Sequence, residues 1–369
     1  MRILVCNWKD TAHPHAGGAE VYTHEVLRRW AAAGHEVTLF CAAVPGRPER
    51  ELVDGVRVVR RGGRLGVYRQ ARWFLREVGP AAFDVAIDEV NTRPFGLAGV
   101  RGAPPVVALV HQVAREIWFS ELPLPLAALG RFVLEPAWLR AYRDVPVLTV
   151  SPSSRDSLRA YGLRRISIVP EGVAVEPRRT PPAKEPLPTL VFVGRLTESK
   201  RPKDALAAFR LIRAQIPSAR LWVIGTGPLE QRLRRLREPG VTFHGRISEE
   251  AKLDLVARAH ALVVTSVREG WGLVVDEAAA MATPAVGYDV PGLADSIPTA
   301  GGVLVPPSPA ALAAELVRRL PVWLRQPARA GWAGGARSWD AVADAVLQAV
   351  VAETGCVAAP AARLEAVRA

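Results

Sequence analysis

The stretch that decides the fold reads Arg268-Glu269-Gly270-Trp271-Gly272-Leu273-Val274-Val275-Asp276-Glu277. Two carboxylates, Glu269 and Glu277, bracket a Gly-x-Gly turn, and an apolar helical pattern follows through Ala282. Glycines permit tight turns and close approach of a ligand, and the new helix points its free N–H groups at whatever lies in front of it. Carboxylates accept hydrogen bonds from hydroxyls, so the pattern suits a ligand with both hydroxyls and phosphates, such as a nucleotide sugar. Charge–dipole preference at a helix start explains the acids equally well on spacing alone.

Around this stretch, short β-rich runs alternate with longer helical patterns along the whole chain, which is typical of parallel α/β construction. The expected strands are 3–6, 36–41, 56–60, 85–87, 106–110, 147–150 and 166–169, then 190–193, 220–224, 241–244, 261–265 and 285–288. The expected helices are 17–33, 66–78, 126–143 and 153–161, then 202–215, 228–236, 249–259, 273–282, 309–320 and 338–351. Two such sheets that face each other place their strand C-terminal ends around one cleft, where α/β ligands bind.

A proline-rich segment separates the two halves. Five prolines between Glu176 and Pro188 exclude a helix or a central strand. We therefore predict an N-terminal domain over 1–175, a linker over 176–188 and a C-terminal domain over 189–335. The remaining residues, 336–369, are expected to form a helix that packs back on the N-terminal domain and a frayed tail.

Composition excludes several function classes. Hydrophobic residues make up 49% and charged residues 23% of the 369 residues, as in an ordinary globular protein. The formal net charge of +12 comes from scattered arginines without an aromatic-interleaved basic tract, which argues against nucleic acid. Three cysteines without C-x-x-C spacing, and no signal peptide or transmembrane run, predict a cytoplasmic protein without a cysteine metal site. The apolar stretch Ile117–Leu126 suits core packing, which we favour, or contact with a membrane surface or a hydrophobic acceptor, and it begins the most apolar region of the chain, Ile117–Leu139.

Two groups in the first half are candidate ligand contacts. Gly17 and Gly18 follow the first strand and start the first helix, where paired glycines let a diphosphate approach. Many strand–helix turns carry glycine for geometry alone, and no G-x-G-x-x-G follows a strand, which argues against a nicotinamide enzyme. His111 ends strand 106–110 and would face the cleft, with a satisfied structural histidine as the alternative. Asp10 and His13 to His15 are the only metal-ligand candidates, and a loop on the acceptor side explains them better.

The second half adds two cations. Arg195 and Lys200 follow strand 190–193, beside the start of the next helix. They can neutralise a pyrophosphate leaving group electrostatically, as Mg²⁺ does elsewhere, although surface charge is the simpler alternative. Ile247 follows strand 241–244 and is placed to line a base pocket through backbone groups.

Taken together, the chain resembles the retaining family 4 glycosyltransferases of GT-B fold over nearly its whole length. The most specific part is the E-x7-E element from Glu269 to Glu277. The other motifs are Val193–Leu196 with Lys200, Ile224–Pro228, Val169–Val173, and Asn7–Asp10 with His13–Pro14 and Gly17–Glu20. The last of these is similar to a subgroup that often acts on glycoconjugates or secondary metabolites. The resemblance implies two Rossmann-like parallel-sheet domains that face each other across a cleft.

The resemblance also implies residue roles. Arg195 and Lys200 would bind the donor diphosphate with the Gly17–Gly18 backbone, Glu269 the transferred sugar and Glu277 the ribose hydroxyls. The backbone N–H groups of Gly272, Leu273 and Val274 would bind sugar or phosphate, and His111 would lie against the donor sugar near the anomeric carbon. The family generally works without a bound metal, with the departing phosphate helping to deprotonate the acceptor. Three departures bear on donor identity: Trp271 replaces phenylalanine, Glu171 and Ala174 replace Asn and Asp, and Ala282 replaces glycine.

The expected function is therefore a retaining glycosyltransferase that moves a hexose-type sugar from a nucleoside diphosphate, UDP before GDP, to a hydroxyl acceptor. The acceptor would be a glycan, a lipid-linked compound or a small molecule. No further cofactor and no nucleic acid partner are expected, and the protein would act in the cytoplasm or at the inner face of the membrane. A GT-B epimerase or phosphorylase is the alternative within the fold, and a non-catalytic nucleotide-sugar sensor is the alternative outside enzymology.

Overall fold

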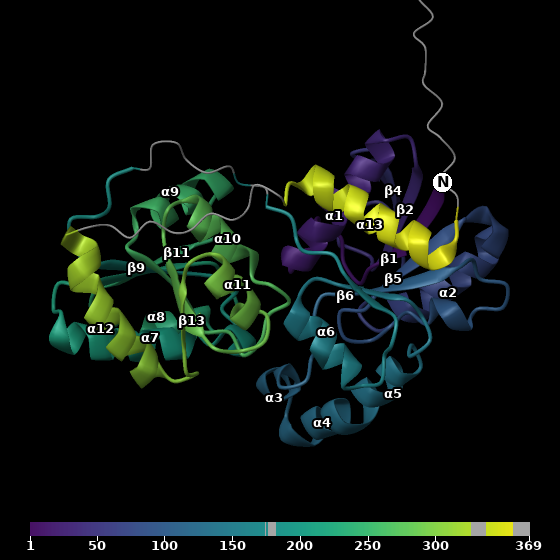
Figure 1. Ribbon diagram of the computed structural model, residues 1–369. Helices are drawn as coiled ribbons and strands as arrows, with labels where there is room; N and C mark the ends of the chain where they lie inside the picture. Colours follow the sequence, from purple (N-terminus) through teal and green to yellow (C-terminus); the bar gives the residue numbers. More distant parts are fainter. Residues whose placement is uncertain (174, 176–181, 326–336, 357–369) are drawn as a thin grey trace, which may run out of the picture.

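The chain folds into two α/β lobes, each built on one sheet (Figure 1). A computed structural model describes residues 1–173, 175, 182–325 and 337–356. The first sheet has eight strands and the second has six. The predicted fold class, two parallel-sheet domains, is therefore confirmed. The predicted linker and the tail predicted after residue 351 each lie partly outside the described residues.

The N-terminal sheet is parallel except at one edge, where β3 and β4 run antiparallel. From edge to edge its strands are β3 (Arg50–Val53), β4 (Val56–Arg60), β2 (Glu36–Cys41), β1 (Arg2–Cys6), β5 (Val85–Glu89), β6 (Val106–Val110), β7 (Val147–Thr149) and β8 (Ile166–Ile168). Sequence reasoning missed β3, a four-residue edge strand. The overlooked signal is Asp54-Gly55, whose φ angles of 47° and 81° suit a two-residue hairpin turn.

Strand alternation sends side chains to both faces of this sheet, so both are covered by helices. Ile3 and Val5 face α1 (Gly18–Ala32) and α13 (Trp339–Thr354), whereas Leu4 and Cys6 face α2 (Val67–Val78). Farther along, α5 (Glu135–Arg140) and α6 (Pro152–Arg159) cover β6 and β7 on the α2 side. Short 3₁₀ turns, η1 (Pro80–Ala82) and η2 (Leu97–Gly99), complete this lobe.

The C-terminal sheet is parallel throughout. Its strands, in spatial order, are β11 (Val241–Gly245), β10 (Arg220–Ile224), β9 (Thr189–Val193), β12 (Ala261–Val264), β13 (Ala285–Tyr288) and β14 (Val303–Val305). One face carries α7 (Pro202–Gln215), α8 (Glu230–Arg235) and α12 (Pro309–Arg325). The other carries α9 (Glu249–Arg258), α10 (Leu273–Ala280) and α11 (Leu293–Thr299). The 3₁₀ turn η4 (Glu198–Lys200) follows β9. The sequence did not predict β14 or α11, both of which are short.

The apolar region after β6 largely agrees with its prediction. A single helix over 126–143 was expected, and the chain is helical without interruption over 124–140, as α4 (Leu124–Leu129), the π-helical turn η3 (Gly130–Leu134) and α5. The short helix α3 (Ile117–Glu121), which was not predicted, ends before Pro123, and Pro136 removes a backbone donor next to the π-helical turn. Core packing, the favoured explanation of Ile117–Leu126, is wrong for three of its large side chains, since Phe119, Leu124 and Leu126 are exposed. Farther along, Leu129, Phe132 and Val133 are exposed as well.

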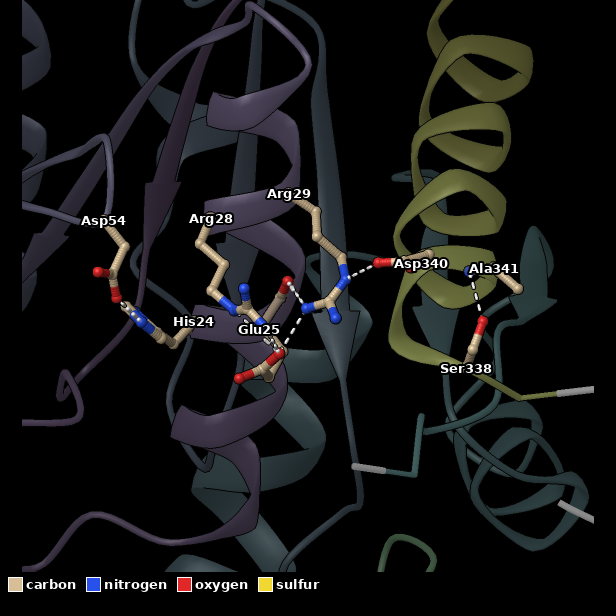
Figure 2. A network of polar contacts seen from close by, with 8 residues as sticks. All are labelled: His24, Glu25, Arg28, Arg29, Asp54, Ser338, Asp340 and Ala341. Atoms are coloured by element: carbon tan, nitrogen blue, oxygen red, sulfur yellow. Dashed lines mark hydrogen bonds and ion pairs between the residues drawn. The ribbon is translucent and has the colours of Figure 1, made fainter. Parts of the chain in front are cut away.

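The last described helix belongs spatially to the N-terminal lobe, where the yellow α13 lies beside α1 (Figure 1). Trp30 Nε1 of α1 donates to the Ala343 carbonyl at 2.9 Å, and Arg29 bonds Asp340 across the two helices. Figure 2 shows Arg29 bridging from Glu25 of its own helix to Asp340, with Ser338 capping α13 through the Ala341 amide. No described helix is long and apolar enough to cross a membrane.

Candidate active site

The carboxyl ends of the two sheets meet at the stretch 268–277. A Cβ atom placed on Gly270 of the C-terminal lobe would lie 3.0 Å from the carbonyl oxygen of His111, which follows β6. Gly18, at the start of α1, lies against Leu273, the first residue of α10, with 3.5 Å from its ideal Cβ position to the Leu273 Cδ1 atom. Two helix N-termini from different lobes therefore approach each other here. Their partial positive charge makes the junction suitable for an anion.

Lys200 and Glu269 form the centre of this junction on the C-terminal side. The Lys200 ammonium and a Glu269 carboxylate oxygen form an ion pair, and the Ser266 hydroxyl donates to the same oxygen at 2.6 Å. The Glu269 side chain is 12% exposed and that of Lys200 33%, so the pair is partly open to solvent. A phosphate that approaches Lys200 therefore competes with Glu269, and a sugar hydroxyl can take the place that the ammonium releases.

Glu277 has a similar cationic partner. Lys252 of α9 donates to its carboxylate at 2.7 Å and to Glu249 at 2.6 Å. Burial raises the pKa of Glu277, while the charge of Lys252 opposes this rise. Glu277 lies in the second turn of α10, on the side of the helix that faces α9. A carboxylate held by one cation keeps lone pairs available for hydroxyls.

Backbone donors at the two helix starts differ in availability. The Gly17 N–H donates to Glu20 Oε2 at 2.6 Å, and Glu20 in turn pairs with Lys9 at 3.1 Å, so Gly17 is already occupied. Gly272, the residue before α10, has a φ of 95°, a conformation that glycine adopts without strain. This turn aims the amides of Leu273 and Val274 out of the helix start.

Arg195 is exposed, and its side chain makes no hydrogen bond or ion pair with the described part of the chain. The turn after β10 packs against the loop that carries Arg195. A Cβ atom on Gly225 would lie 2.1 Å from the Gly194 carbonyl, so only glycine fits there. The Leu196 amide also donates to the Thr226 carbonyl at 2.9 Å. Ile247, after β11, is half-buried and packs against the cluster that contains α9 and α10.

His111 lies between two buried carboxylates, neither of which the sequence predicted as a site residue. Its Nδ1 is 3.1 Å from Glu171 Oε1 and its Nε2 is 3.5 Å from Glu89 Oε1. Burial by itself would lower the pKa of His111, but the two acids outweigh this effect and raise it to about 10. His111 is therefore an imidazolium at neutral pH, with both ring nitrogens directed at acids, and is unsuited to act as a base.

Trp271 is directed into the N-terminal lobe, where it joins the core cluster that contains Val169 and Trp339. Its Nε1 donates to Asp276 at 2.6 Å, and Arg337 pairs with the same carboxylate at 2.7 Å. The Arg337 guanidinium also lies 4.7 Å from the Trp271 ring centre. The tryptophan thus anchors the glycine turn to the segment that leads into α13. Ala174, the other departure beside Glu171, lies outside the described residues.

The described residues contain no group of three His, Cys, Asp or Glu side chains that is arranged to hold a metal ion. Asp10 pairs with buried Arg60 at 2.6 Å, and His13 bonds the His15 amide at 3.0 Å, so these loop residues have local partners.

Comparisons with known proteins agree with this geometry. Residues 16–177 match the family model described as Glycosyltransferase Family 4, and residues 187–320 match that described as Glycosyl transferases group 1. A D-inositol 3-phosphate glycosyltransferase of Nocardiopsis dassonvillei is 30% identical, with 89% of each chain covered. The chain belongs to glycosyltransferase family 4.

Two further similarities place this glycosyltransferase among its relatives. A GDP-mannose-dependent alpha-(1-6)-phosphatidylinositol dimannoside mannosyltransferase of Mycobacterium tuberculosis is 31% identical, over 81% of this chain and 83% of that protein. Sucrose-phosphate synthase of Thermosynechococcus elongatus shares the fold, with a TM-score of 0.74 at 23% identity over 94% and 97% of the two chains. The protein is thus a GT-B glycosyltransferase that uses a nucleotide-sugar donor.

Sequence reasoning missed several partners of the site residues. Glu89 ends an apolar strand with Asp88, and a pair of acids at such a carboxyl edge is a signal that could have identified it. Glu171 was noted as a departure from the family pattern but not as a partner of His111. Lys252 and Arg337 carry no local signal, because each comes from an element remote in sequence.

Proposed function

We propose that this glycosyltransferase moves a hexose-type sugar from UDP, in preference to GDP, to a hydroxyl group of a glycoconjugate or secondary metabolite, with retention of anomeric configuration. The observation that carries the proposal is the partly open Lys200–Glu269 pair beside the facing starts of α1 and α10. A diphosphate needs positive charge, and a hexose needs hydroxyl acceptors. Both occur within this one group of residues.

The chemistry follows from where charge develops. As the bond from the anomeric carbon to the diphosphate oxygen breaks, negative charge grows on the diphosphate and positive charge on the sugar. The negative charge on the diphosphate would be stabilised by Arg195, Lys200 and the amides at the start of α10. The Glu269 carboxylate would lie against the positively charged sugar. The acceptor oxygen bonds the anomeric carbon on the face that the diphosphate leaves, and its proton passes to the departing phosphate. His111 would lie against the sugar as a fixed polar ring, because Glu171 and Glu89 hold its two nitrogens and balance its charge.

The lysines argue against the phosphorylase alternative. A Schiff base needs a lysine that is neutral and free. Burial lowers the pKa of Lys184 to about 8, yet its ammonium bonds the Ala259 and Ala282 carbonyls and the Thr283 hydroxyl, away from the junction. Lys200 is paired with Glu269.

Donor and reaction can be tested together. UDP-, GDP-, ADP- and dTDP-sugars are first compared by thermal shift, since a ligand of the folded state raises its stability by mass action. We expect the UDP-sugar to give the largest shift. Nucleoside diphosphate should then be released only when an acceptor is added, and NMR of the product should show the anomeric configuration of the donor. Release without acceptor, with an epimerised nucleotide sugar, would indicate the epimerase, and binding without product would indicate a sensor.

We further propose that the exposed apolar side chains of α3, α4 and η3 contact the inner face of an anionic membrane. The mannosyltransferase relative is named for a phosphatidylinositol acceptor, which supports a membrane location. Exposed Arg140 and Arg143 lie close by in the chain and match the charge of such a surface. A variant with Leu126→Ser and Phe132→Ser should lose sedimentation with phosphatidylglycerol vesicles. Leu211→Ser, a control at an exposed position of α7, should not. Equal sedimentation of all three proteins would contradict the contact.

A further inference from the structure

The short helix α3 of the N-terminal lobe contacts the other lobe at both of its ends. Glu116, at its start, accepts from the Arg268 guanidinium at 3.0 and 3.1 Å. Glu121, its last residue, accepts from the Ser199 amide at 3.3 Å, where α3 lies against η4. Arg268 and Ser199 each directly precede one member of the ion pair at the centre of the junction. The two ends of α3 therefore contact the backbone segments that carry this pair.

The turn η4, which carries Lys200, is fixed from both lobes. In its own lobe, the Thr265 hydroxyl donates to the Lys200 and Arg201 carbonyls, each at 2.9 Å. Arg201 has a φ of 48°, which residues other than glycine rarely adopt, so the turn needs such support. From the other lobe, Glu121 holds the Ser199 amide. Loss of this contact would free the backbone beside the Lys200 ammonium.

A buried carboxylate, that of Glu135, anchors the start of α3. Glu135 is 2% exposed and accepts hydrogen bonds from two backbone amides and two side chains. The donors are the Ala114 amide at 2.6 Å, the Arg115 amide at 3.0 and 3.2 Å, Trp118 Nε1 at 3.3 Å and the Tyr161 hydroxyl at 3.2 Å. Arg115 has a φ of 38°, so this loop also adopts a conformation that needs support from outside. Glu135 supplies it by holding two consecutive amides.

The π-helical turn η3 leads directly into Glu135 and packs against α3. A Cβ atom on Gly130, the first residue of η3, would lie 2.3 Å from the Trp118 ring, so a larger residue would displace that ring. The carbonyl of His111, which begins the anchored loop, accepts from the Ser154 hydroxyl at 2.7 Å. The loop and α3 are thus held at several points inside the N-terminal lobe. This lobe can therefore support the contacts at the two ends of α3.

We propose that α3 positions the Lys200–Glu269 pair from the opposite lobe, with Glu135 as the buried anchor of α3, so that Glu121 and Glu135 are positioning residues for donor binding and transfer. The inference rests on the proposed function, which places the donor at this pair. Neither carboxylate touches the donor in this scheme. Each acts by holding a backbone segment, and small displacements of such segments matter because transfer depends on groups held close to the productive geometry.

Hydrogen exchange of the ligand-free protein tests the link between the lobes apart from turnover, because it measures local opening of the backbone. We expect residues 112–121 and 197–201 to exchange at least tenfold faster in Glu135→Gln, whose amide group turns a donor toward donors. In Glu121→Ala, only 197–201 should exchange faster. Tyr161→Phe removes one of the hydrogen bonds to Glu135 and should give a smaller change in both segments, which decides the matter if Glu135→Gln does not fold.

Tyr142→Phe is the matched control for Tyr161→Phe. The Tyr142 hydroxyl bonds Asp88, another buried carboxylate that accepts several backbone amides, but in the loop after β5. This variant should leave the exchange of 112–121 and 197–201 as it is in the natural chain. Natural exchange of 197–201 in Glu121→Ala, or a change in Tyr161→Phe that is confined to 112–121, would overturn the proposal.

Donor binding then shows whether α3 acts through Lys200. UDP affinity is measured by calorimetry and kcat with the acceptor found for the natural chain. We expect Glu121→Ala to bind UDP at least threefold more weakly and to lower kcat at least fivefold. Glu121→Gln keeps an acceptor for the Ser199 amide and should recover most of both losses. In a Lys200→Ala background, Glu121→Ala should weaken UDP binding no further, since the two changes affect one contact.

The outcomes separate the two proposals. Losses that multiply in the Lys200→Ala, Glu121→Ala double variant, or no recovery in Glu121→Gln, would overturn positioning through α3 while leaving the glycosyl transfer intact. A natural chain that neither binds UDP nor transfers a sugar would contradict the proposed function. Hydrogen exchange would in that case still decide whether α3 fixes the 197–201 segment.

Discussion

At the scale of the residue, the site depends on how charges are paired. His111 is 8% exposed, yet it keeps its proton because Glu171 and Glu89 lie at its two ring nitrogens. Removing one partner of a buried pair typically costs roughly 3 kcal/mol or more, since the remaining charge loses its compensation. A surface histidine–carboxylate pair such as His24–Asp54 contributes much less, because water screens it.

Replacing Glu171 by Gln should therefore lower the pKa of His111 from about 10, and NMR titration of the ring measures it. The folded-state pKa lies above the unfolded value of about 6.5. The contribution of protonated His111 to the stability of the folded state is thus complete below pH 6.5 and is lost as pH rises toward 10. We expect the natural chain to lose stability across this window, and Glu171→Gln to be less stable at pH 6 with a flatter pH dependence. Asp54→Asn, the control, should change the free energy of unfolding by less than about 1 kcal/mol. An unchanged pKa for His111 in Glu171→Gln would contradict the assignment.

At the scale of the element, the start of α11 fixes the loop that carries Glu269. The Glu269 amide donates to the Pro291 carbonyl at 3.0 Å, and Gly292 follows with a φ of 85°. A Cβ atom on Gly292 would lie 2.2 Å from the Glu269 carbonyl oxygen, which no side chain can accept without movement. The position of the Glu269 carboxylate thus depends on a glycine in a neighbouring helix start.

Gly292→Ala should therefore displace Glu269 and lower kcat at least tenfold, with a lower melting temperature. Gly34→Ala is a matched control, because Gly34 has a φ of 88° but no atom within 4 Å of its ideal Cβ position. Both glycines have a positive φ that other residues rarely adopt, so both variants are strained, and Gly292 alone also has the contact with Glu269. We therefore expect a clearly lower kcat in Gly292→Ala than in Gly34→Ala. Equal activity in the two variants would show that this contact does not position the carboxylate.

At the scale of the whole molecule, the lobes are joined by polar contacts that begin in the 268–277 stretch. Arg268 has a 3% exposed side chain and reaches into the N-terminal lobe. It donates to Glu116 at 3.0 and 3.1 Å and to Ser157 at 3.1 Å. The Ser153 amide of α6 donates to Asp295 of α11 at 3.0 Å. Together with Trp271, which enters the core cluster of the N-terminal lobe, these polar contacts hold the two lobes together.

Arg268→Gln should loosen the junction without unfolding either lobe. Small-angle scattering should show a larger radius of gyration, and the KM for the nucleotide sugar should rise severalfold, because the proposed donor site includes His111 of one lobe and Lys200 and Glu269 of the other. Arg155→Gln is the control, since Arg155 on α6 pairs only with its neighbour Asp156 among the described residues. A variant with natural dimensions and donor KM would show that Arg268 does not hold the lobes together.

The sequence predicted most elements because they are locally encoded. Strand 106–110 and helix 202–215 were placed at their observed bounds by apolar periodicity and flanking breakers. Misses occurred where local signals were short or conflicted. The edge strand β3 has four residues, and the unpredicted helix α3 has five.

From the sequence alone one could predict two parallel α/β sheets, which the structure confirms, whereas the common location of Arg195, Lys200, Glu269 and Glu277 in one donor site stays a prediction. Periodicity and turn chemistry are properties of neighbouring residues, so they can be read along the chain. The tertiary structure alone decided the partners: Lys200 with Glu269, Lys252 with Glu277, and His111 with Glu89 and Glu171. Whether a buried charge is compensated depends on groups brought together from distant elements, and no local pattern specifies which groups those are.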